Sequence, residues 1–426
     1  MVDQSVSGVH PRPVINNSNE SGIGRSSDAV RELLTVTLKQ SGPAAFCEML
    51  FERADMMRAT DIHLDPSEDG THLRFRVDGF MHDVTLLEND AAMQVISRIK
   101  LLAGMDITDR RLAQDGHLSG LARKGKADIR IGTGPTIHGE RMVMRLMPDP
   151  EILIDLESLG MVSEQCELVR SALAAAGGMM LVVGPVGSGK STTTYACLSH
   201  LNRPDISTVT IEDPVERRVR GASQIQVDPR IDFGFVQALR GVLRQDPDVI
   251  MIGEIRDAET ANIAVRAALT GVNVLSTLHA SDSSTVIDVL RQFGIPPIFV
   301  AESLKCVIAQ RLVRLICPKH REQYVPDALT AEILGISKES AANTRLTKGI
   351  PAPANYLTGY DGRTGIFEVM ILNQPVRDAV IRDVPAPEVH EVAKQNGLIT
   401  LQDSAIRAVL AGKTTVQEMI RVLPAV

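Results

Sequence analysis

One eight-residue segment constrains the fold of this chain more than any other feature. Residues 184–191 read Gly-Pro-Val-Gly-Ser-Gly-Lys-Ser, after the apolar run Met179–Val183 and before the helical stretch Thr192–Leu201. A strand, a glycine-rich loop and a helix, in that order, are the context in which such a loop binds phosphate. Glycines let backbone N–H groups turn toward phosphate oxygens, and the helix N-terminus adds its partial positive charge.

Two side chains of this loop complete a predicted nucleotide site. We expect Lys190 to contact the β- and γ-phosphates and the Ser191 hydroxyl to bind Mg²⁺. An ordinary glycine-rich turn would not be expected to carry all the fixed positions and both flanking elements. The sequence therefore predicts ATP and Mg²⁺ as cofactors. The residues expected to bind nucleotide are Gly184, Pro185, Val186, Gly187, Ser188, Gly189, Lys190, Ser191 and Thr192.

Further short apolar runs alternate with amphipathic helical stretches. Together with Met179–Val183, they are Thr208–Ile211, Val249–Ile252 and Val274–Leu278. Unbroken apolar strands separated by helical crossovers predict a parallel sheet that is covered on both faces. Polar groups follow the runs, and in a parallel sheet they would project from the carboxyl edge, where ligands bind. These groups are Glu212, Asp213, Glu254 and His279.

Each of these groups has a candidate role. Gly253 stands where the simpler form of the second nucleotide motif has Asp, so we assign Glu254 to orienting the attacking water. We expect Mg²⁺ to be held by Ser191 and, through water, by Glu212 or Asp213. His279 is placed to sense the γ-phosphate. Taken singly, the carboxylates could be solvated loop residues and the histidine a satisfied structural one.

The chain divides into five predicted parts. Leu73, Phe75 and Val77 alternate with polar residues before the parallel-sheet region, which indicates a small mixed α/β domain. Two prolines in the segment Met147-Pro-Asp-Pro favour a linker at about 147–152. The parts are a flexible arm with one short helix near 29–39 (1–43), the small domain (44–147), the nucleotide core (153–317), an irregular insertion (318–360) and a mainly helical C-terminal region (361–426).

Composition narrows the possible partners. The net charge is −7 and aromatic residues make up 3%, with no Trp, so a nucleic-acid partner is not expected. The five cysteines form no CxxC pair, which favours reduced thiols in a reducing compartment. The N-terminus has no secretory signal, and the longest weakly polar run, Ala172–Gly187, is too short to span a bilayer. We expect a cytoplasmic protein that meets the membrane only through partners.

Seven segments together resemble one known family. The chain is similar, from about Ala54 to its C-terminus, to the secretion ATPases of the type II secretion and type IV pilus class. The segments are Ala59-Thr-Asp-Ile-His-Leu-Asp-Pro66, Arg111-Leu-Ala-Gln-Asp-Gly-His117, the phosphate loop, Ile211-Glu-Asp-Pro-Val-Glu216, Leu243–Asp257, Leu275-Ser-Thr-Leu-His279 and Gly359-Tyr-Asp-Gly-Arg-Thr-Gly365.

The resemblance implies a fold and an assembly. It implies a RecA-like P-loop core with a mostly parallel sheet, preceded by a smaller mixed α/β, PAS-like domain and followed by a mainly helical part. The segments around Glu212 and His279 correspond to the family's aspartate and histidine boxes. Family members are hexameric rings that bind nucleotide between the two domains, under arginines of the smaller domain. By motif, the best candidates are Arg111 and Arg130, and weaker ones are Arg240 and Arg244.

The resemblance also implies a function. We expect a hexameric cytoplasmic ATPase that powers assembly of a type IV pilus or a type II secretion pseudopilus. It would act through an inner-membrane platform protein and an associated cytoplasmic docking protein. The alternatives are a pilus-retraction ATPase, a DNA-translocating ring ATPase and a regulatory nucleotide-binding protein. The segment Gly359–Gly365 favours the assembly or secretion branch.

A zinc site of the family is not expected here. Secretion members commonly carry a four-cysteine zinc insertion before the segment that corresponds to Gly359–Gly365. In this chain only Cys317 remains there, followed by His320. Structural zinc requires four Cys or His ligands, so we predict no structural zinc.

Overall fold

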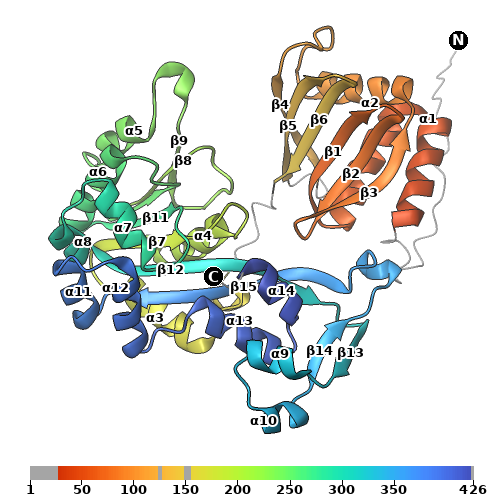
Figure 1. Cartoon of the computed structure of the whole chain (residues 1–426). Helices are drawn as coiled ribbons and strands as arrows, with labels where there is room; N and C mark the ends of the chain where they lie inside the picture. Colours follow the sequence, from red (N-terminus) through yellow and green to blue (C-terminus); the bar gives the residue numbers. More distant parts are fainter. Residues whose placement is uncertain (1–26, 123–126, 148–154, 424–426) are drawn as a thin grey trace, which may run out of the picture.

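The computed structural model describes residues 27–122, 127–147 and 155–423. A small N-terminal domain lies beside a larger core, and the long strands β12 and β15 of the core run beneath the small domain (Figure 1). Residues 1–26 of the expected arm and most of the expected linker lie outside the described residues.

The small domain is a six-stranded antiparallel sheet against which two helices pack. The strand order is β3-β2-β1-β6-β5-β4. Leu73, Phe75 and Val77 are buried, as their alternation predicts. The elements are α1 (Ser27–Met56), β1 (Ala59–Ser67), β2 (Gly70–Val77), β3 (Phe80–Leu87), α2 (Asn89–Leu102), β4 (Gln114–Ala122), β5 (Ala127–Thr136) and β6 (Gly139–Leu146).

Helix α1 departs from the expectation of an arm that extends to residue 43. It begins at Ser27, and Val30 and Leu34 are buried in the same core as Phe46. The helix is interrupted only at Gly42, whose φ of 77° is accessible to glycine and which precedes Pro43. The short helix expected near residues 29–39 lies within α1, where Val30 and Leu34, at i, i+4 spacing, pack in the core of the small domain.

The core contains a seven-stranded sheet in the order β15-β12-β7-β11-β10-β8-β9. All neighbours are parallel except β12 and β15, which confirms a mostly parallel sheet. The strands are β7 (Gly178–Val183), β8 (Thr208–Glu212), β9 (Ser223–Gln226), β10 (Val249–Ile252), β11 (Asn273–Leu278), β12 (Leu304–Ile316) and β15 (Tyr360–Ile371).

Both faces of this sheet are buried. Met180 and Val182 of β7 pack with α3 and α4, whereas Met179 and Leu181 pack with α5 to α8 on the other face. This explains why the strands read as unbroken apolar runs. The helices are η3 (Glu157–Leu159), α3 (Ser163–Ala174), α4 (Lys190–Leu201), η4 (Pro229–Ile231), α5 (Phe235–Val242), α6 (Ala258–Leu269), α7 (Thr285–Gln292) and α8 (Pro297–Ser303).

The C-terminal region is continuous with the core. Strand β15 extends the core sheet beyond residue 317, and Val376, Val389 and Val409 of the following helices belong to the same apolar cluster. The insertion is more regular than expected, with two short helices and a two-stranded sheet. The elements of the insertion are β13 (Arg321–Tyr324), α9 (Ala328–Ile333), α10 (Lys338–Asn343), β14 (Leu346–Gly349) and η5 (Pro353–Asn355). The helices that follow β15 are α11 (Gln374–Ile381), α12 (Ala386–Gln395), α13 (Leu401–Leu410) and α14 (Val416–Val422).

The segment Gly359–Gly365 contacts the small domain at several points, including an ion pair between Asp361 and Arg58. The carboxylate of Asp78, in the β2–β3 turn, accepts a hydrogen bond from the Gly362 N–H at 2.8 Å and forms an ion pair with Arg363 at 3.4 Å. Beside it, the Arg314 guanidinium contacts the Phe80 ring of the small domain and the Tyr360 ring of β15, at 4.1 and 4.0 Å from their centroids. This contact joins the small domain to the end of the core sheet.

Glu418 stabilises this junction through its contact with Arg314. Its fully buried carboxylate accepts hydrogen bonds from Arg314 at 2.8 Å and from Arg421 at 2.9 Å. Burial alone would raise the pKa of Glu418, but the hydrogen bonds from Arg421 and Arg314 outweigh it and lower the pKa to about 2. A depressed pKa adds stability that is complete above the ordinary value of 4.5 and is lost as the pH falls toward 2.

We expect Glu418→Gln to lower the free energy of unfolding at pH 7 by about 3 kcal/mol, because it leaves Arg314 without its buried counter-charge. Denaturant unfolding at pH 7 and pH 4 measures this, and the difference from the parent should shrink at the lower pH. The matched control is Glu322→Gln, which breaks an exposed pair with Lys348 and should cost less than about 1 kcal/mol. A pH-independent loss would contradict the ionic explanation.

Three further expectations concern membrane-spanning helices, the run Ala172–Gly187 and the cysteines. None of the helices in the described residues is long and apolar enough to cross a membrane. The run Ala172–Gly187 forms the end of α3, strand β7 and the start of the phosphate loop. All five cysteines are buried and are not joined in disulfides.

Candidate active site

The phosphate loop connects β7 to α4 in a conformation that requires glycine. Gly184, Gly187 and Gly189 have φ values of 150°, 78° and 89°. At Gly184 a Cβ atom would also lie 2.6 Å from the carbonyl oxygen of Gln310, on the neighbouring strand β12. The loop is therefore held close to β12, and α4 begins at Lys190 with its N-terminus toward the loop.

Lys190 folds back over this loop. Its Nζ donates to the carbonyl oxygens of Gly184 and Pro185, at 2.9 and 3.1 Å. Burial lowers the pKa of Lys190, the Glu254 carboxylate opposes that shift, and the positive charge of Arg311 adds to it. A bound phosphate would offer this ammonium a stronger acceptor than either carbonyl. The loop and Lys190 thus fit a nucleotide, and Ser191 lies half-buried in the first turn of α4.

Groups from three strand ends meet beside the loop. His279, after β11, lies with Nε2 3.6 Å from Oε2 of Glu254, after β10. Arg256 pairs with Glu254 and also lies 3.7 Å from the Asp213 carboxylate, after β8. The structure thereby brings together Glu254, His279 and Asp213, as expected for the carboxyl edge of a parallel sheet.

Hydrogen bonds between neighbouring strands, at these same ends, fix the relative positions of the groups. The Thr277 hydroxyl donates to the Gly253 carbonyl at 2.8 Å, and the Gly253 N–H donates to the Ile211 carbonyl at 2.8 Å. A Cβ atom at Gly253 would lie 3.4 Å from that same carbonyl. Gly253 thus stands at the position where the simpler motif has Asp, and the next residue, Glu254, supplies the carboxylate.

Glu212 lies apart from this group, in a buried network. Its side chain is almost wholly buried and accepts hydrogen bonds from the Tyr195 hydroxyl, from Thr210 at 2.6 Å and from Gln224 at 3.1 Å. Burial and the Glu212 carboxylate raise the pKa of Tyr195, so the phenol remains a donor. The Tyr195 hydroxyl also accepts the N–H of Arg217 at 3.2 Å. These contacts favour a structural role for Glu212, and its expected role toward Mg²⁺ stays a prediction.

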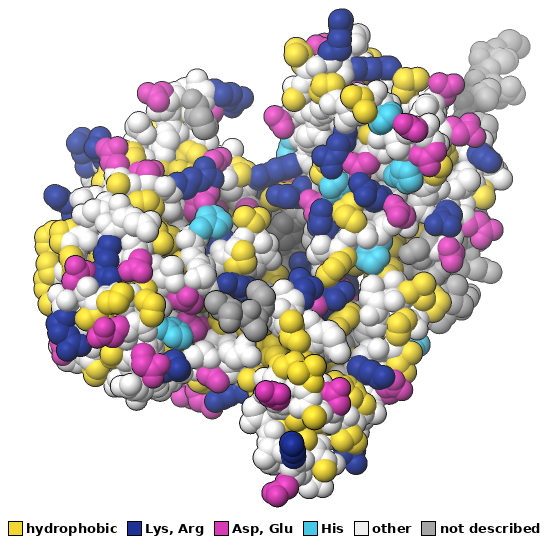
Figure 2. All heavy atoms as spheres, in the orientation of Figure 1, with side chains coloured by type: hydrophobic (Ala, Val, Ile, Leu, Met, Phe, Trp, Pro, Cys, Tyr) yellow, Lys and Arg dark blue, Asp and Glu magenta, His cyan; other side chains and the backbone are white. Residues whose placement is uncertain are grey.

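Arg130 lies at the boundary between the domains. From β5 it reaches the Val215 carbonyl, three residues after Glu212, at 3.4 Å. Burial lowers the pKa of Arg130, and the Glu216 carboxylate opposes this shift. A cleft of about 1430 Å³ opens here between β4 to β6 and residues 214–218, and Figure 2 shows the molecule hollowed between the two domains.

Arg111 lies in the loop between α2 and β4, with its side chain exposed. The buried Lys100 fixes this loop, because its Nζ donates to the Asp109 carbonyl at 2.7 Å and to Glu140 at 2.8 Å. The Asp109 carboxylate in turn accepts the Arg111 N–H at 2.7 Å. Among the described residues, the lining of the cleft includes Arg130 but neither Arg111 nor any residue of the phosphate loop.

Comparisons with known proteins now identify the family. The family described as "Type II/IV secretion system protein" matches residues 41–421 of this chain. The chain belongs to this family. A type II secretion system protein E from Dickeya dadantii is 40% identical over 374 residues, which cover 86% of this chain and 72% of that protein.

The length of this secretion-family chain differs from that of its relatives. The type IV pilus assembly ATPase PilB of Thermus thermophilus is 37% identical over 90% of this chain but only 43% of its own length. The type II secretion system protein E of Xanthomonas campestris pv. campestris is 38% identical over 88% of this chain and 66% of its own length. The chain thus spans about half to two thirds of the length of these two curated relatives.

Solved structures confirm the fold of the secretion-family chain. The ATPase DotB of Legionella pneumophila has a TM-score of 0.66 at 20% identity, and the match covers 89% of this chain and 95% of that one. A pilus retraction motor PilT, crystallised with bound ADP, has a TM-score of 0.60 at 22% identity, with 89% and 97% covered. At these identities the likeness concerns the fold.

Three residues of the site were not assigned from the sequence. Arg256 stands two positions after Glu254, so its proximity was a usable signal. Tyr195 on α4 donates to Glu212, and Gln310 on β12 donates to the phosphate loop, from positions that carry no local motif. Arg240, a weaker candidate, donates to Glu259 at 2.6 Å on the surface of α5 and α6.

We expect Glu212→Gln to lower the free energy of unfolding by about 2 kcal/mol. Tyr195, Thr210 and Gln224 all donate to this carboxylate, and the amide of glutamine would oppose donors with its own N–H groups. Denaturant unfolding measures the loss, with Glu302→Gln as an exposed control on α8. An increased Mg²⁺ requirement with unchanged stability would instead support the metal role of Glu212.

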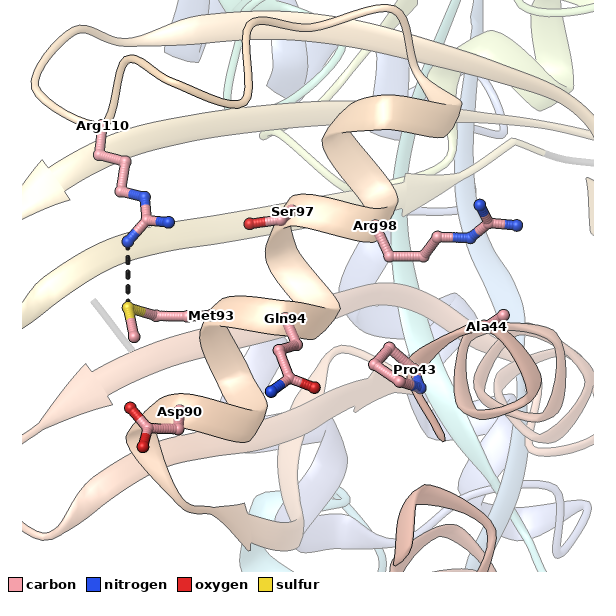
Figure 3. Close-up of a pocket in the computed structure, with 8 residues that line it drawn as sticks. All are labelled: Pro43, Ala44, Asp90, Met93, Gln94, Ser97, Arg98 and Arg110. Atoms are coloured by element: carbon pink, nitrogen blue, oxygen red, sulfur yellow. Dashed lines mark hydrogen bonds between the residues drawn. The ribbon is translucent and has the colours of Figure 1, made fainter. Parts of the chain in front are cut away.

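A second pocket is formed entirely by residues of the small domain. It measures about 610 Å³ and is formed between the Gly42 interruption of α1 and the exposed side of α2. Figure 3 shows Arg110 donating to Met93 Sδ on one side, with Pro43 on the other. Its lining contains no residue of the phosphate loop or of the strand ends: Pro43, Ala44, Asp90, Met93, Gln94, Ser97, Arg98 and Arg110.

Proposed function

We propose that this chain hydrolyses ATP with Mg²⁺ and that hydrolysis powers assembly of a type IV pilus or a type II secretion pseudopilus. The observation that carries the proposal is the phosphate loop with Lys190 folded over it, beside the Glu254–His279 pair. Named relatives support it, since they include a pilus assembly ATPase and type II secretion proteins.

The residues divide the work as follows. Lys190 and the loop N–H groups bind the phosphates, and Ser191 holds Mg²⁺, with Asp213 as a water-mediated partner. Mg²⁺, when bound, offsets negative charge on the β- and γ-phosphates. Glu254 orients the attacking water and accepts its proton, while the ion pair with Arg256 holds the carboxylate in place. His279, 3.6 Å from Glu254, responds to the γ-phosphate.

Assembly and partners complete the proposal. The chain works as a homohexamer in the cytoplasm, where the exposed Arg111 reaches the nucleotide of a neighbouring copy. It reaches the inner membrane through a platform protein and an associated docking protein. A retraction motor is the nearest alternative, and a pilin-assembly assay with the cognate platform protein separates the two directions of work.

The test is a measurement of Mg²⁺-dependent phosphate release by the purified chain, together with its mass by light scattering. We expect hydrolysis, and a mass of six 46.2 kDa chains when a non-hydrolysable ATP analogue is bound. A monomer that binds nucleotide without releasing phosphate would favour a regulatory protein. Stimulation by nucleic acid with a steep salt dependence would favour a DNA-translocating ring.

Mixing two inactive variants tests the neighbouring arginine. Arg111→Ala chains keep Lys190, and Lys190→Ala chains keep Arg111. If the arginine acts across a subunit boundary in a head-to-tail ring, a 1:1 mixture should regain activity at roughly a quarter of its sites. Arg110→Ala, which removes the contact with Met93, is the control and should be active by itself. A mixture that stays inactive counts against an arginine from a neighbour.

A further inference from the structure

Strand β12 places two adjacent side chains beside the phosphate loop. It runs parallel to β7, with Ile308 opposite Val182 and Ala309 opposite Val183, so Gln310 and Arg311 lie level with the start of the loop. Adjacent residues of a strand point to opposite faces of the sheet. Gln310 and Arg311 can therefore contact two different loops, one on each face of the sheet.

Gln310 holds the phosphate loop from the α4 side. Its side chain is almost wholly buried, and Nε2 donates to the Ser188 carbonyl at 2.5 Å. A Cβ atom at Gly189 would lie 3.0 Å from the same Nε2, just as one at Gly184 would meet the Gln310 carbonyl. Gly184 and Gly189, at the two ends of the phosphate loop, thus both pack closely against Gln310.

Arg311 holds the loop after β11 from the other face. Its Nη2 donates to the Ser281 carbonyl at 2.6 Å, and its Nη1 donates to the Gln310 carbonyl at 3.0 Å. Ser281 is two residues from His279. Three hydrogen bonds therefore connect Ser188 to Ser281 without a gap: Ser188 to Gln310, Gln310 to Arg311, and Arg311 to Ser281.

A second anchor holds the far side of this loop. The buried carboxylate of Glu368, on β15, accepts the Ser283 N–H at 2.9 Å and the Leu401 N–H at 3.1 Å, and lies 3.3 Å from His390. With Ser283 fixed in this way, a displacement of Ser281 must change the path of the chain between it and His279. The position of His279 thus depends on Arg311.

We propose that Gln310 and Arg311 are positioning residues that couple the phosphate loop to the loop carrying His279. When nucleotide shifts Ser188, the shift reaches Ser281 through the Gln310 side chain and the Arg311 guanidinium. The same shift thereby changes how His279 lies against Glu254, from which it is 3.6 Å away in the structure. The kinetic part of this proposal rests on the proposed ATP hydrolysis, whereas its structural part does not.

The kinetic test is a double-mutant cycle. We expect Arg311→Gln to lower kcat about 10- to 100-fold with KM for ATP changed less than about threefold, because a misplacement of about 1 Å costs that much in rate. In a His279→Ala background, the same substitution should lower kcat less than about twofold, since both changes act on one group. Full additivity of the two effects would overturn the coupling.

Two variants separate geometry from charge. Arg311→Lys keeps the positive charge near Lys190 but replaces the two separate Nη donors, which reach the Gln310 and Ser281 carbonyls, by one nitrogen on a shorter side chain. We therefore expect it to stay close to Arg311→Gln in kcat. Full recovery by lysine would show that charge alone matters and would overturn the proposal. Lys305→Gln is the matched control, because Lys305 donates to the Ala175 carbonyl at 2.7 Å from the opposite end of β12.

Hydrogen exchange tests the coupling without any turnover. We expect Gln310→Ala to speed amide exchange at least about threefold in residues 184–189 and also in 279–284, and Arg311→Gln to do the same, with Lys305→Gln changing neither. A change confined to the loop nearest each substitution would overturn the proposal. If the parent chain released no phosphate, the proposed function would fail, while this measurement would still decide the coupling.

Discussion

Lys190→Ala should nearly abolish ATP hydrolysis and weaken nucleotide binding, and this is one of the two largest effects that we expect. In the structure the Lys190 Nζ lies over the loop and donates to the carbonyl oxygens of Gly184 and Pro185, so it is in place to contact a bound phosphate. Loss of a charge-assisted hydrogen bond to phosphate weakens binding about 10- to 100-fold. Loss of positive charge at the transition state lowers kcat a further 10² to 10³-fold or so.

The measurement for Lys190→Ala combines titration of a fluorescent nucleotide with a phosphate-release assay. Its matched control is Lys305→Ala, since Lys305 is likewise half-buried and donates to a backbone carbonyl, but at the opposite edge of the sheet. The control should bind and hydrolyse ATP like the parent chain. Parent-like hydrolysis by Lys190→Ala would contradict the assignment of residues 184–191 as the phosphate site.

Glu254→Gln should stop turnover and leave nucleotide binding intact. Glutamine has the size of glutamate and can still contact Arg256, so the strand end should keep its shape. It cannot accept a proton, however, and a lost general base costs about 10²- to 10⁴-fold in rate. We therefore expect a Kd for ATP within about threefold of the parent value and a kcat at least about 100-fold lower.

Glu259→Gln is the control for this change, because Glu259 also pairs with an arginine, Arg240, at an exposed site on the same side of the sheet. It should leave kcat unchanged. Single-turnover release of phosphate separates chemistry from product release in both variants. Hydrolysis at the parent rate by Glu254→Gln would transfer the water-positioning role to another residue, and Asp213 would be the next to test.

The sequence predicts those parts of the site that are local. The phosphate loop is one continuous segment, and Glu254 and His279 each follow directly on a strand whose apolar run is plain. Strand direction then brings them together, because parallel strands end at one edge. The meeting of Glu254 with His279 is a consequence of topology that the pattern already contains.

Parts that depend on distant pairing were not predictable in this way. The burial of Glu212 is set by Tyr195, which is 17 positions away on a helix, and by Gln224 on an edge strand. Strand β15 joins the core sheet only after an insertion of more than 40 residues, so no local pattern indicated its partner. The contact of Gln310 with the phosphate loop likewise depends on the register of β12 against β7, which no local pattern indicates.

The stacking of Arg314 at the junction of the domains has a mechanical consequence. The contact between a guanidinium and a ring face has no fixed donor direction, so Phe80 can slide along Arg314 and keep most of the attraction. The hydrogen bond and the ion pair of Asp78 lie at the same edge and would move little during a rotation about it. We therefore expect the boundary to resist separation at this edge, so that a rotation of the small domain about it would change distances most in the cleft lined by β4 to β6 and residues 214–218.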